Sequence, residues 1–448
     1  MGLVKVEDFG SRIDRLSVSA RNFIHLVSNS VYGSQLFLVF VTFFLLSTST
    51  FVMAEENKHL TAVLQGNGLF TRNAYQILAQ EKGKNIFFSP ISIHAILSLA
   101  SQGSGGKTQK ALTSALQVAD IATLAEGYKA AMLKLNSVED VTLLMANKVY
   151  VKNEYALKDE FKDKVVNHFF SEVQNVDFSQ SAAAAKTINT WVEEKTKDKI
   201  KDLIQPDDLN DDTRLVLVNA IYFKGKWAAP FKPEDTKTEK FYLNDNDSID
   251  VQMMHTKKKF FFKNDEALDA KVLELPYTNK DLSMIVILPN KRNGINELEL
   301  KLANTDLTKI TENMFRPDVI VALPKFKIET TINLEEPLTK LGLGVIFSDH
   351  ADFTGMLKSP EPLKVSKVIH KAFIEVNEEG AEAAAATVMK MKMVKKVRLP
   401  PPVQEFIADH PFLVVLILRE KDENEDLTIN ILFKGKLSSP TYNVPNVK

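Results

Sequence analysis

Residues 378–402, EEGAEAAAATVMKMKMVKKVRLPPP, carry the most informative chemical pattern of this chain. From Ala381 to Met393 every second residue is small or apolar, and Lys390 and Lys392 stand between the methionines. Such alternation is typical of a β-strand with one buried face, because successive side chains point to opposite faces of a sheet. The composition alone fits an alanine-rich helix equally well. A two-residue period, however, scatters the methionines around a helix, so we favour a strand.

The flanks of this segment indicate a loop that can become a strand. Glu378, Glu379 and Gly380 are expected to form a hinge, because glycine tolerates backbone conformations that other residues avoid. Pro400–Pro402 hold the other end in an extended conformation that cannot pair inside a sheet. The chemistry expected here is therefore backbone hydrogen bonding to other strands.

The sequence lacks the residue combinations that catalytic and metal sites require. The chain has no cysteine, which excludes disulfides, thiolate metal sites and a cysteine nucleophile. It contains no G-x-S-x-G motif, the signature of an α/β-hydrolase nucleophile. The histidines show no spacing typical of metal ligands; they are His25, His59, His94, His168, His255, His350, His370 and His410. We therefore expect no enzyme activity, no metal and no cofactor.

Residues 101–108, SQGSGGKT, come close to a phosphate-binding loop. Ser101 stands where that motif requires its first glycine, and the preceding residues have a helical pattern where the motif requires a strand. The sequence favours a loop that ends a helix. Lys257–Lys259, beside Phe260–Phe262, are interpreted as a solvated strand end and not as a polyanion site.

Composition fits one globular domain. Hydrophobic residues make up 45% of the chain, and the formal net charge of −1 gives no general attraction to nucleic acid. The sequence has no internal repeat and no long low-complexity linker. We expect residues 1–54 to be an N-terminal extension with a signal peptide and residues 55–448 to form a single domain.

The N-terminal extension points to secretion. Leu36–Leu46 form an apolar run that is short for a membrane span, and small residues suited to signal-peptidase cleavage precede Glu55. The stretch before this run is longer than an ordinary leader and contains acidic residues, which leaves a signal anchor open. We favour a secreted, extracellular protein without a stable membrane partner; translation from Met53 would make it cytosolic. The sequon at Asn246 is a candidate glycosylation site.

Hydrophobic periodicity predicts a mixture of helices and strands. Helices are expected near Leu60–Glu81, Ile91–Ser101 and Thr187–Ile204. Strands are expected at Val141–Val151, Leu215–Phe223, Leu282–Leu288, Val319–Ile328, Val368–Val376 and Phe412–Leu418.

Several motifs, in their order along the chain, resemble the serpin family. Residues 378–402 resemble a serpin hinge and reactive-centre loop, in a form similar to arthropod secreted inhibitory serpins. Asn219–Trp227, followed by Phe231, is similar to the family's central strand motif. The other matching stretches are Asn85–Ile93, Ala351–Gly355, Phe406 and Ala408–Leu413. The resemblance spans residues 60–442 and implies the α+β serpin fold, a single domain with a large central β-sheet, further sheets, surrounding helices and an exposed reactive-centre loop.

The resemblance implies a suicide-substrate inhibitor of serine proteases. In this family the protease cleaves the loop and stays attached as an acyl-enzyme while the loop inserts as an extra strand, a well-known case of strand addition. The expected partner is a serine protease, held in a covalent complex by a monomeric inhibitor. The hinge residues are Glu378, Glu379, Gly380, Ala381, Glu382, Ala383, Ala384, Ala385, Ala386 and Thr387. A non-inhibitory carrier, storage or chaperone role is the alternative.

Two counts along the loop give different reactive-site bonds. Counting from Gly380, as the resemblance implies, gives Val394–Lys395, whereas counting back from the prolines gives Arg398–Leu399. We favour Val394–Lys395, because the number of loop residues inserted between the hinge and the cleaved bond decides whether the attached protease is distorted. A trypsin-like enzyme could cut after Lys395 or Lys396, and an elastase-like enzyme after Val394.

The resemblance also implies a site at which the central sheet opens. A histidine matching His370 pairs in serpins with an asparagine matching Asn219, near a serine matching Ser92. Buried polar groups are tolerated only when they are hydrogen-bonded, so a cluster of replaceable bonds would act as a gate. Ser89 belongs to the same stretch as Ser92, and Trp227 is expected near the top of the sheet, where the loop first inserts.

Overall fold

A computed structural model describes residues 57–80, 83–380, 402–421 and 427–442, and its helices and three β-sheets confirm the α+β class. The five-stranded sheet has the order β11 (Phe326–Asn333), β12 (Lys367–Val376), β4 (Leu215–Gly225), β2 (Val141–Lys152) and β3 (Glu172–Val176). The six-stranded sheet has the order β1 (Ile86–Phe88), β15 (Leu427–Leu437), β14 (Phe412–Lys421), β9 (Leu282–Pro289), β8 (Ala270–Pro276) and β7 (Phe261–Asp265). The four-stranded sheet has the order β13 (Gln404–Ile407), β10 (Asp318–Pro324), β6 (Ser248–Lys259) and β5 (Lys237–Tyr242).

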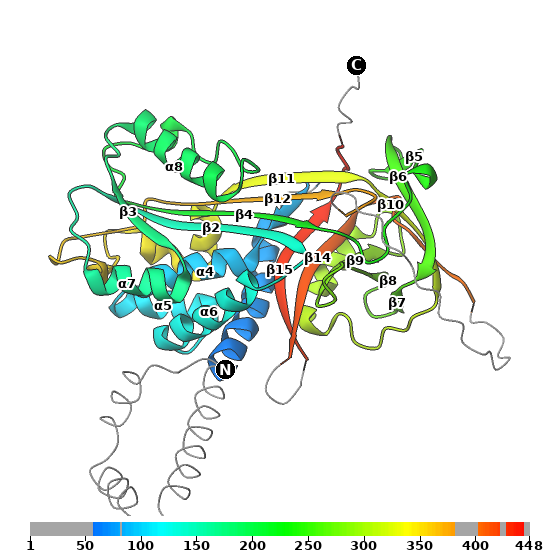
Figure 1. The fold of residues 1–448 in the computed structure, drawn as a ribbon, viewed down its shortest axis with the longest axis horizontal. Coiled ribbons are helices and arrows are strands. Elements are labelled where there is room, and N and C mark those ends of the chain that lie inside the picture. Colours follow the sequence, from blue (N-terminus) through cyan, green and yellow to red (C-terminus); the bar gives the residue numbers. More distant parts are fainter. Residues whose placement is uncertain (1–56, 81–82, 381–401, 422–426, 443–448) are drawn as a thin grey trace, which may run out of the picture. The chain divides into compact units, whose positions relative to one another are not determined.

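Helices cover both faces of the five-stranded sheet (Figure 1). One face carries α8 (Ser181–Lys195), and the opposite, inner face carries α4 (Pro90–Ser101). Around α4 lie α5 (Gly106–Leu116), α6 (Ile121–Asn136) and α7 (Asp159–Phe169). A helix at residues 57–78 packs on α6 through its first half, and its Tyr75 hydroxyl donates to Glu299 of α9 (Ile295–Leu302).

The sequence of β4 explains its burial on both sides. Leu217 and Ile221 belong to the main core on the inner face, whereas Val216 and Val218 pack beneath α8. A strand that is buried on both faces requires a nearly continuous apolar run rather than alternation, and LVLVNAIYF is such a run.

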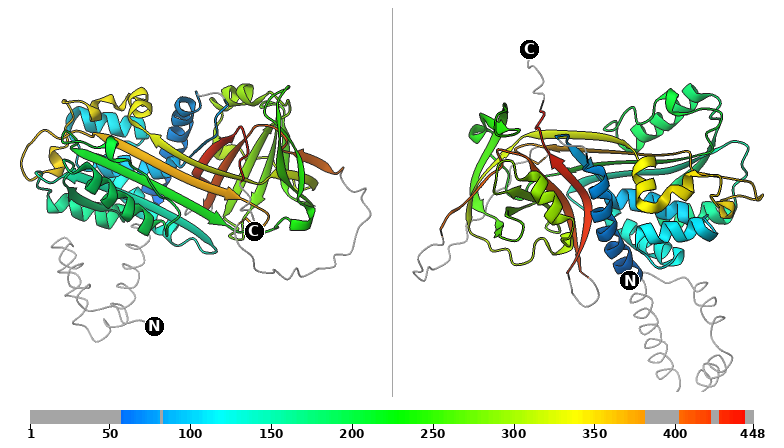
Figure 2. Two further views of the ribbon diagram at one scale, coloured as in Figure 1. Left: turned by 90° about the horizontal axis from the view of Figure 1, so that it is seen from above. Right: turned by 180° about the vertical axis from the view of Figure 1, so that it is seen from behind.

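The two inner strands β4 and β12 lie side by side and are parallel (Figure 2). Their register runs from Lys367↔Val216 to Phe373↔Tyr222. On the outer sides, pairing continues further, to Val376 between β12 and β11 and to Gly225 between β4 and β2. We call this β4–β12 boundary the seam, its Gly225 end the head and its Leu215 end the foot. Within the described residues, β4 and β12 pair over a shorter length than β12 with β11 or β4 with β2.

Most predicted elements are confirmed, with two corrections. The predicted helix Thr187–Ile204 is wrong at both ends: α8 begins at Ser181 and ends at Lys195, because Lys197 and Asp198 take left-handed backbone conformations. The predicted strand Val319–Ile328 is two strands, β10 and β11, which belong to different sheets. They separate at Lys325, after Pro324, which has no N–H with which to continue a ladder.

The loop at residues 101–108 ends a helix, as predicted. Helix α4 ends at Ser101, and α5 begins at Gly106. The Gly105 N–H donates to the Asp352 carbonyl oxygen at 3.0 Å, and the Asp352 N–H donates to Thr108 Oγ1 at 2.9 Å. The loop is therefore tied to another part of the chain and not arranged around a phosphate. Lys259 ends β6, which confirms the predicted strand end.

Candidate functional site

A row of three buried polar residues crosses the middle of the five-stranded sheet. Asn147 on β2 lies opposite Asn219 on β4, and Asn219 lies opposite His370 on β12. Their side chains point to the inner face, where the N-terminus of α4 carries Ser89 and Ser92. Ser89 is the N-cap of this helix and Pro90 its first residue, a combination that strongly favours a helix start.

His370 joins both strands of the seam to α4. Its Nδ1–H donates to Asn219 Oδ1, and its Nε2 accepts from the Ser89 N–H at 3.1 Å. Accepting at Nε2 requires the neutral ring with its proton on Nδ1. Complete burial lowers the pKa of His370 to about 3, so the ring stays neutral near neutral pH.

Asn219 is the centre of the cluster. Its Nδ2 donates to the Ser92 carbonyl oxygen at 3.0 Å and also contacts Ser92 Oγ and Asn147 Oδ1. Ser89 Oγ donates to the Leu432 carbonyl oxygen of β15 at 2.7 Å. These bonds connect the seam to α4 and to the six-stranded sheet.

The structure brings together the four cluster residues expected from the sequence: Ser89, Ser92, Asn219 and His370. The sequence analysis missed Asn147. The only signal for it was an asparagine in the middle of an otherwise apolar strand, and the strand register was required to place it opposite Asn219.

Trp227 lies at the head of the seam, where it was expected. Its ring stacks on Tyr277 with 4.5 Å between ring centroids. Its indole Nε1–H donates to the Asn377 carbonyl oxygen, and its backbone N–H donates to the Glu379 carbonyl oxygen, each at 3.0 Å. Trp227 therefore fixes the chain that leaves β12.

Gly380 touches the end of β4. It has φ +82°, and an added Cβ would lie 2.5 Å from the Gly225 carbonyl oxygen and 2.6 Å from the Trp227 nitrogen. Both the backbone conformation and the close approach require glycine. The predicted hinge thus begins directly above the seam.

Glu378 is anchored more firmly than a hinge residue was expected to be. Its carboxylate accepts from Thr236 Oγ1 and pairs with Lys325 Nζ, each at 2.8 Å. Burial raises the pKa of this carboxyl, but the bonds from Lys325, the backbone and Thr236 outweigh burial, so the pKa lies below its usual value. Glu378 is therefore fixed to its neighbours in the intact protein, and Gly380 is the last residue of the predicted hinge that the structure describes.

The remaining hinge and reactive-site residues lie outside the described residues and stay predictions. They are Ala381, Glu382, Ala383, Ala384, Ala385, Ala386, Thr387, Val394, Lys395, Lys396, Arg398 and Leu399.

Asn246 is exposed, in the turn between β5 and β6. In the part of the chain that the structure describes, no set of His, Cys, Asp and Glu side chains is grouped so that it could hold a metal ion. None of the helices described is both long and apolar enough to span a membrane.

Comparison with known proteins agrees with this architecture. Residues 65–440 match the serpin (serine protease inhibitor) family model. Antitrypsin of Bombyx mori is 39% identical over 361 residues, which cover 80% of this chain and 92% of that protein. Serpin48 of Tenebrio molitor, a highly specific serpin, shares 35% identity with a TM-score of 0.74 over 85% of this chain and 98% of its own.

The structural similarity extends to a serpin named for a ligand. Human thyroxine-binding globulin shares 30% identity with a TM-score of 0.75, over 86% of this chain and 100% of its own. The fold therefore accompanies more than one function. With the family model matching most of its length, the chain belongs to the serpin family.

Proposed function

We propose that this protein is an irreversible suicide-substrate inhibitor of serine proteases, powered by insertion of the loop after Gly380 into the seam. The observation that carries the proposal is the position of Gly380 above the end of β4, in contact with Gly225 and Trp227. A chain that turns back at this point runs antiparallel to both β4 and β12. Insertion would replace one parallel interface by two antiparallel ones, which are slightly more stable per residue.

The Trp227–Glu379 hydrogen bond sets the expected register of insertion. If Glu379 faces Trp227, each further loop residue faces the preceding residue of β4. Met391 then faces Leu215 at the foot, so the seam accommodates the loop from Ala381 to Met391.

This register assigns the small residues of the loop to the crowded side of the sheet. Residues that face each other across an antiparallel pair share a face. Odd-numbered loop residues therefore join Leu217 and Ile221 on the inner face, which is already packed. Ala381, Ala383 and Ala385 fit there because a close-packed interior has no space for larger groups.

Thr387 falls at the level of the polar cluster. In the same register it faces Asn219, which lies opposite His370 in the closed seam. An inserted strand separates these two side chains, and a threonine hydroxyl can both donate and accept. Thr387 would thereby replace the contact that insertion breaks.

The energy is of the size that the mechanism requires. Roughly a dozen new backbone hydrogen bonds at about 0.5–1.5 kcal/mol each would supply on the order of 10 kcal/mol. That is comparable with the whole stability of an ordinary domain, and it would suffice to drag and distort a tethered protease.

A carrier, storage or chaperone role remains the second candidate, because the fold also serves thyroxine-binding globulin. Against it stands the loop sequence. Ala381–Thr387 contains no proline and no bulky residue, and its one charge, Glu382, falls on an even position away from the inner face.

The proposed partner is a trypsin-like or elastase-like serine protease in a covalent one-to-one complex with a monomeric inhibitor. We further propose secretion, supported by the apolar run and small residues before Glu55 and by the exposed position of Asn246. Translation from Met53 would instead give a cytosolic inhibitor.

A mixing experiment tests the inhibitor proposal. Incubation with pancreatic elastase and with trypsin should give a complex that survives denaturing electrophoresis. Ala381→Arg places a charge on the inner face and should convert the protein into a substrate, whereas the matched change Glu382→Arg should leave complex formation intact. Cleaved loop with free, active protease across a panel of both enzyme types would exclude inhibition.

A further inference from the structure

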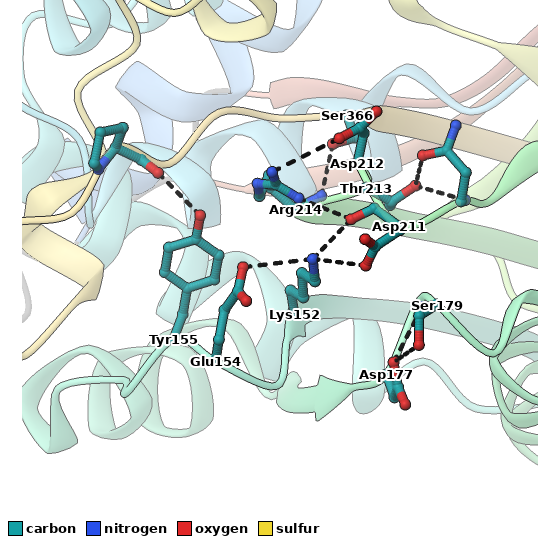
Figure 3. A network of polar contacts seen from close by, with 12 residues as sticks. Lys152, Glu154, Tyr155, Asp177, Ser179, Asp211, Asp212, Thr213, Arg214 and Ser366 are labelled. Atoms are coloured by element: carbon teal, nitrogen blue, oxygen red, sulfur yellow. Dashed lines mark hydrogen bonds and ion pairs between the residues drawn. The ribbon is translucent and has the colours of Figure 1, made fainter.

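The foot of the seam carries a side-chain bond in addition to its strand pairing (Figure 3). At this end the β4–β12 register stops at Lys367↔Val216. One step further, the Ser366 N–H donates to the Leu215 carbonyl oxygen, and Ser366 Oγ accepts from the Arg214 N–H, each at 2.8 Å. The hydroxyl of Ser366 therefore extends the closed seam by one bond that the backbone ladder does not make.

An ion pair crosses the seam at the next residue. Lys367 Nζ, from the first residue of β12, lies 2.6 Å from Asp208 Oδ1, in the segment that leads into β4. The other carboxylate oxygen of Asp208 accepts from the Gln205 N–H at 2.9 Å, which holds the carboxylate in place. Burial raises the pKa of Asp208, but the bonds from Lys367 and Gln205 outweigh burial, so the pKa lies below its usual value. The carboxylate therefore stays ionised near neutral pH.

A second lysine–aspartate pair holds the same segment to β2, on one side of the seam. Lys152 Nζ donates to the Asp211 carbonyl oxygen at 2.7 Å and to Asp211 Oδ1 at 3.0 Å (Figure 3). The Lys152 N–H donates to the Arg214 carbonyl oxygen at 2.9 Å. The two pairs are thus alike in chemistry and length, but Lys152–Asp211 joins β2 to its own side of the sheet, whereas Lys367–Asp208 crosses the seam.

We propose that Ser366 and Lys367 form a clamp that keeps the foot of the seam closed and opens only when loop insertion is completed. The inference rests on the proposed function, because it requires a strand that enters the seam. Gly380 lies against Gly225 at the head, so separation of β4 from β12 begins at that end. The clamp lies at the opposite end and is reached last.

The clamp would control how fast the last part of the seam opens. A partly inserted strand leaves both cross-seam bonds in place, whereas complete insertion has to break them. The side chains of Lys367 and Asp208 are 21% and 36% exposed, so solvent screens their attraction only in part. Removing the clamp should therefore speed inactivation of an attached protease by roughly 2–10-fold, the factor that corresponds to one net hydrogen bond.

Thermal unfolding of intact and loop-cleaved protein tests the clamp. The full chain is cut with trypsin, and mass spectrometry verifies that the cut lies within residues 381–401. The double variant Ser366→Ala/Lys367→Met should lower the Tm of intact protein by about 2 °C. It should leave the cleaved form unchanged, because the clamp is already open there. Ser366→Thr keeps the hydroxyl and should retain the wild-type Tm in both forms.

Lys152→Met is the matched control, because it removes the lysine–aspartate pair that does not cross the seam. It should lower the Tm of intact and cleaved protein equally. The limiting rate of protease inactivation is measured with whichever of pancreatic elastase and trypsin forms the complex. It should rise in the double variant and not in Lys152→Met.

The outcomes separate the clamp from the inhibitor proposal. If cleaved wild type shows a clear gain in Tm, two results overturn the clamp and leave the inhibitor proposal standing. One is a double variant that loses Tm equally in both forms, or in neither, and the other is an unchanged rate of inactivation. No gain in cleaved wild type contradicts the inhibitor proposal itself, and the clamp with it.

Discussion

The five-stranded and six-stranded sheets are both made of apolar strands, but they are closed in different ways. In the six-stranded sheet, β14 and β15 pair antiparallel from Phe412↔Leu437 to Lys421↔Leu427. In the five-stranded sheet, the seam is parallel and pairs only from Lys367 to Phe373 of β12. Interior packing holds both pairs together, but among the described residues the seam alone of the two carries a buried polar contact between its strands, His370–Asn219, at its centre.

The difference between the two strand pairs indicates where a β-sheet can separate to admit another strand. Apolar side chains that are separated lose contacts that an incoming strand with small residues cannot replace. Hydrogen bonds can be exchanged one for one, as long as every buried group finds a new partner. The seam carries such an exchangeable side-chain bond at its centre, between His370 and Asn219, within otherwise apolar strands.

The largest expected effect lies in the six-stranded sheet. Phe433 on β15 is fully buried, with ring centroids 5.0 Å from Phe87 and 6.1 Å from Phe223. Phe433→Ala should lower the free energy of unfolding by about 3–5 kcal/mol, by equal amounts in intact and cleaved protein. Guanidinium titrations of both forms measure this. Phe315→Ala, at a side chain that is 49% exposed, is the control and should cost less than about 0.5 kcal/mol. A loss confined to one form would contradict the view of this sheet as a permanent scaffold.

Acid should weaken the seam next. Burial lowers the pKa of His370 to about 3, whereas an unfolded histidine titrates at about 6.5. Between these values the unfolded chain binds a proton that the folded protein does not, so stability falls as the pH decreases. From pH 6.5 to pH 4, His370 should account for about 3 kcal/mol.

His94, whose pKa burial lowers to about 4, adds to the same trend. The free energy of unfolding measured against pH separates the two residues. In His370→Leu, the part of the acid-induced fall in unfolding free energy that His370 causes should disappear, and the part that His94 causes should remain. An unchanged profile in His370→Leu would mean that the seam histidine is not buried as a neutral ring.

Asn147 should matter less than its neighbours in the cluster. Asn147→Ala removes one hydrogen-bond acceptor of Asn219 Nδ2. The other two acceptors, the carbonyl and hydroxyl oxygens of Ser92, remain. The intact protein should lose about 1 kcal/mol of unfolding free energy. Gln174→Ala, at an exposed residue of the edge strand β3, serves as a comparison. A loss as large as that of Phe433→Ala would assign Asn147 a role that these bonds do not explain.

Thr387 should give an effect of the same small size as Asn147, and only after cleavage. Thr387→Val keeps the shape of the side chain and removes the hydroxyl expected to face Asn219. Cleaved protein should lose about 0.5–1.5 kcal/mol, and intact protein should be unaffected. Equal stability of the two cleaved forms in denaturant would show that the insertion register differs from the one set by Trp227 and Glu379.

Sequence periodicity predicted most strands, because LVLVNAIYF and FLVVLIL are apolar runs of strand length bounded by polar residues. It misplaced α8, since the helix-forming run SAAAAK precedes the predicted start. The end was also wrong, because Thr196 Oγ1 accepts from the Ile200 N–H and closes the chain into a turn. Local pattern cannot show that buried Ile200 and Ile204 belong to a loop.

The site was predictable in its residue types but not in its geometry. The resemblance supplied Ser92, Asn219 and His370, whereas Asn147 could be placed beside Asn219 only by the strand register. Lys325, which pairs with Glu378, lies at the break between β10 and β11. The apolar pattern predicted a single strand, Val319–Ile328, and so gave no sign of this break.

The central claim is that the intact protein is not in its most stable arrangement. Its most direct test is the thermal unfolding of intact and loop-cleaved protein, side by side in the same buffer. A gain on the order of 10 kcal/mol should raise the Tm by about 12 °C in a chain of this size. If the cleaved protein unfolds at the same temperature as the intact one, the seam accepts no strand, and the proposed inhibition has no source of energy.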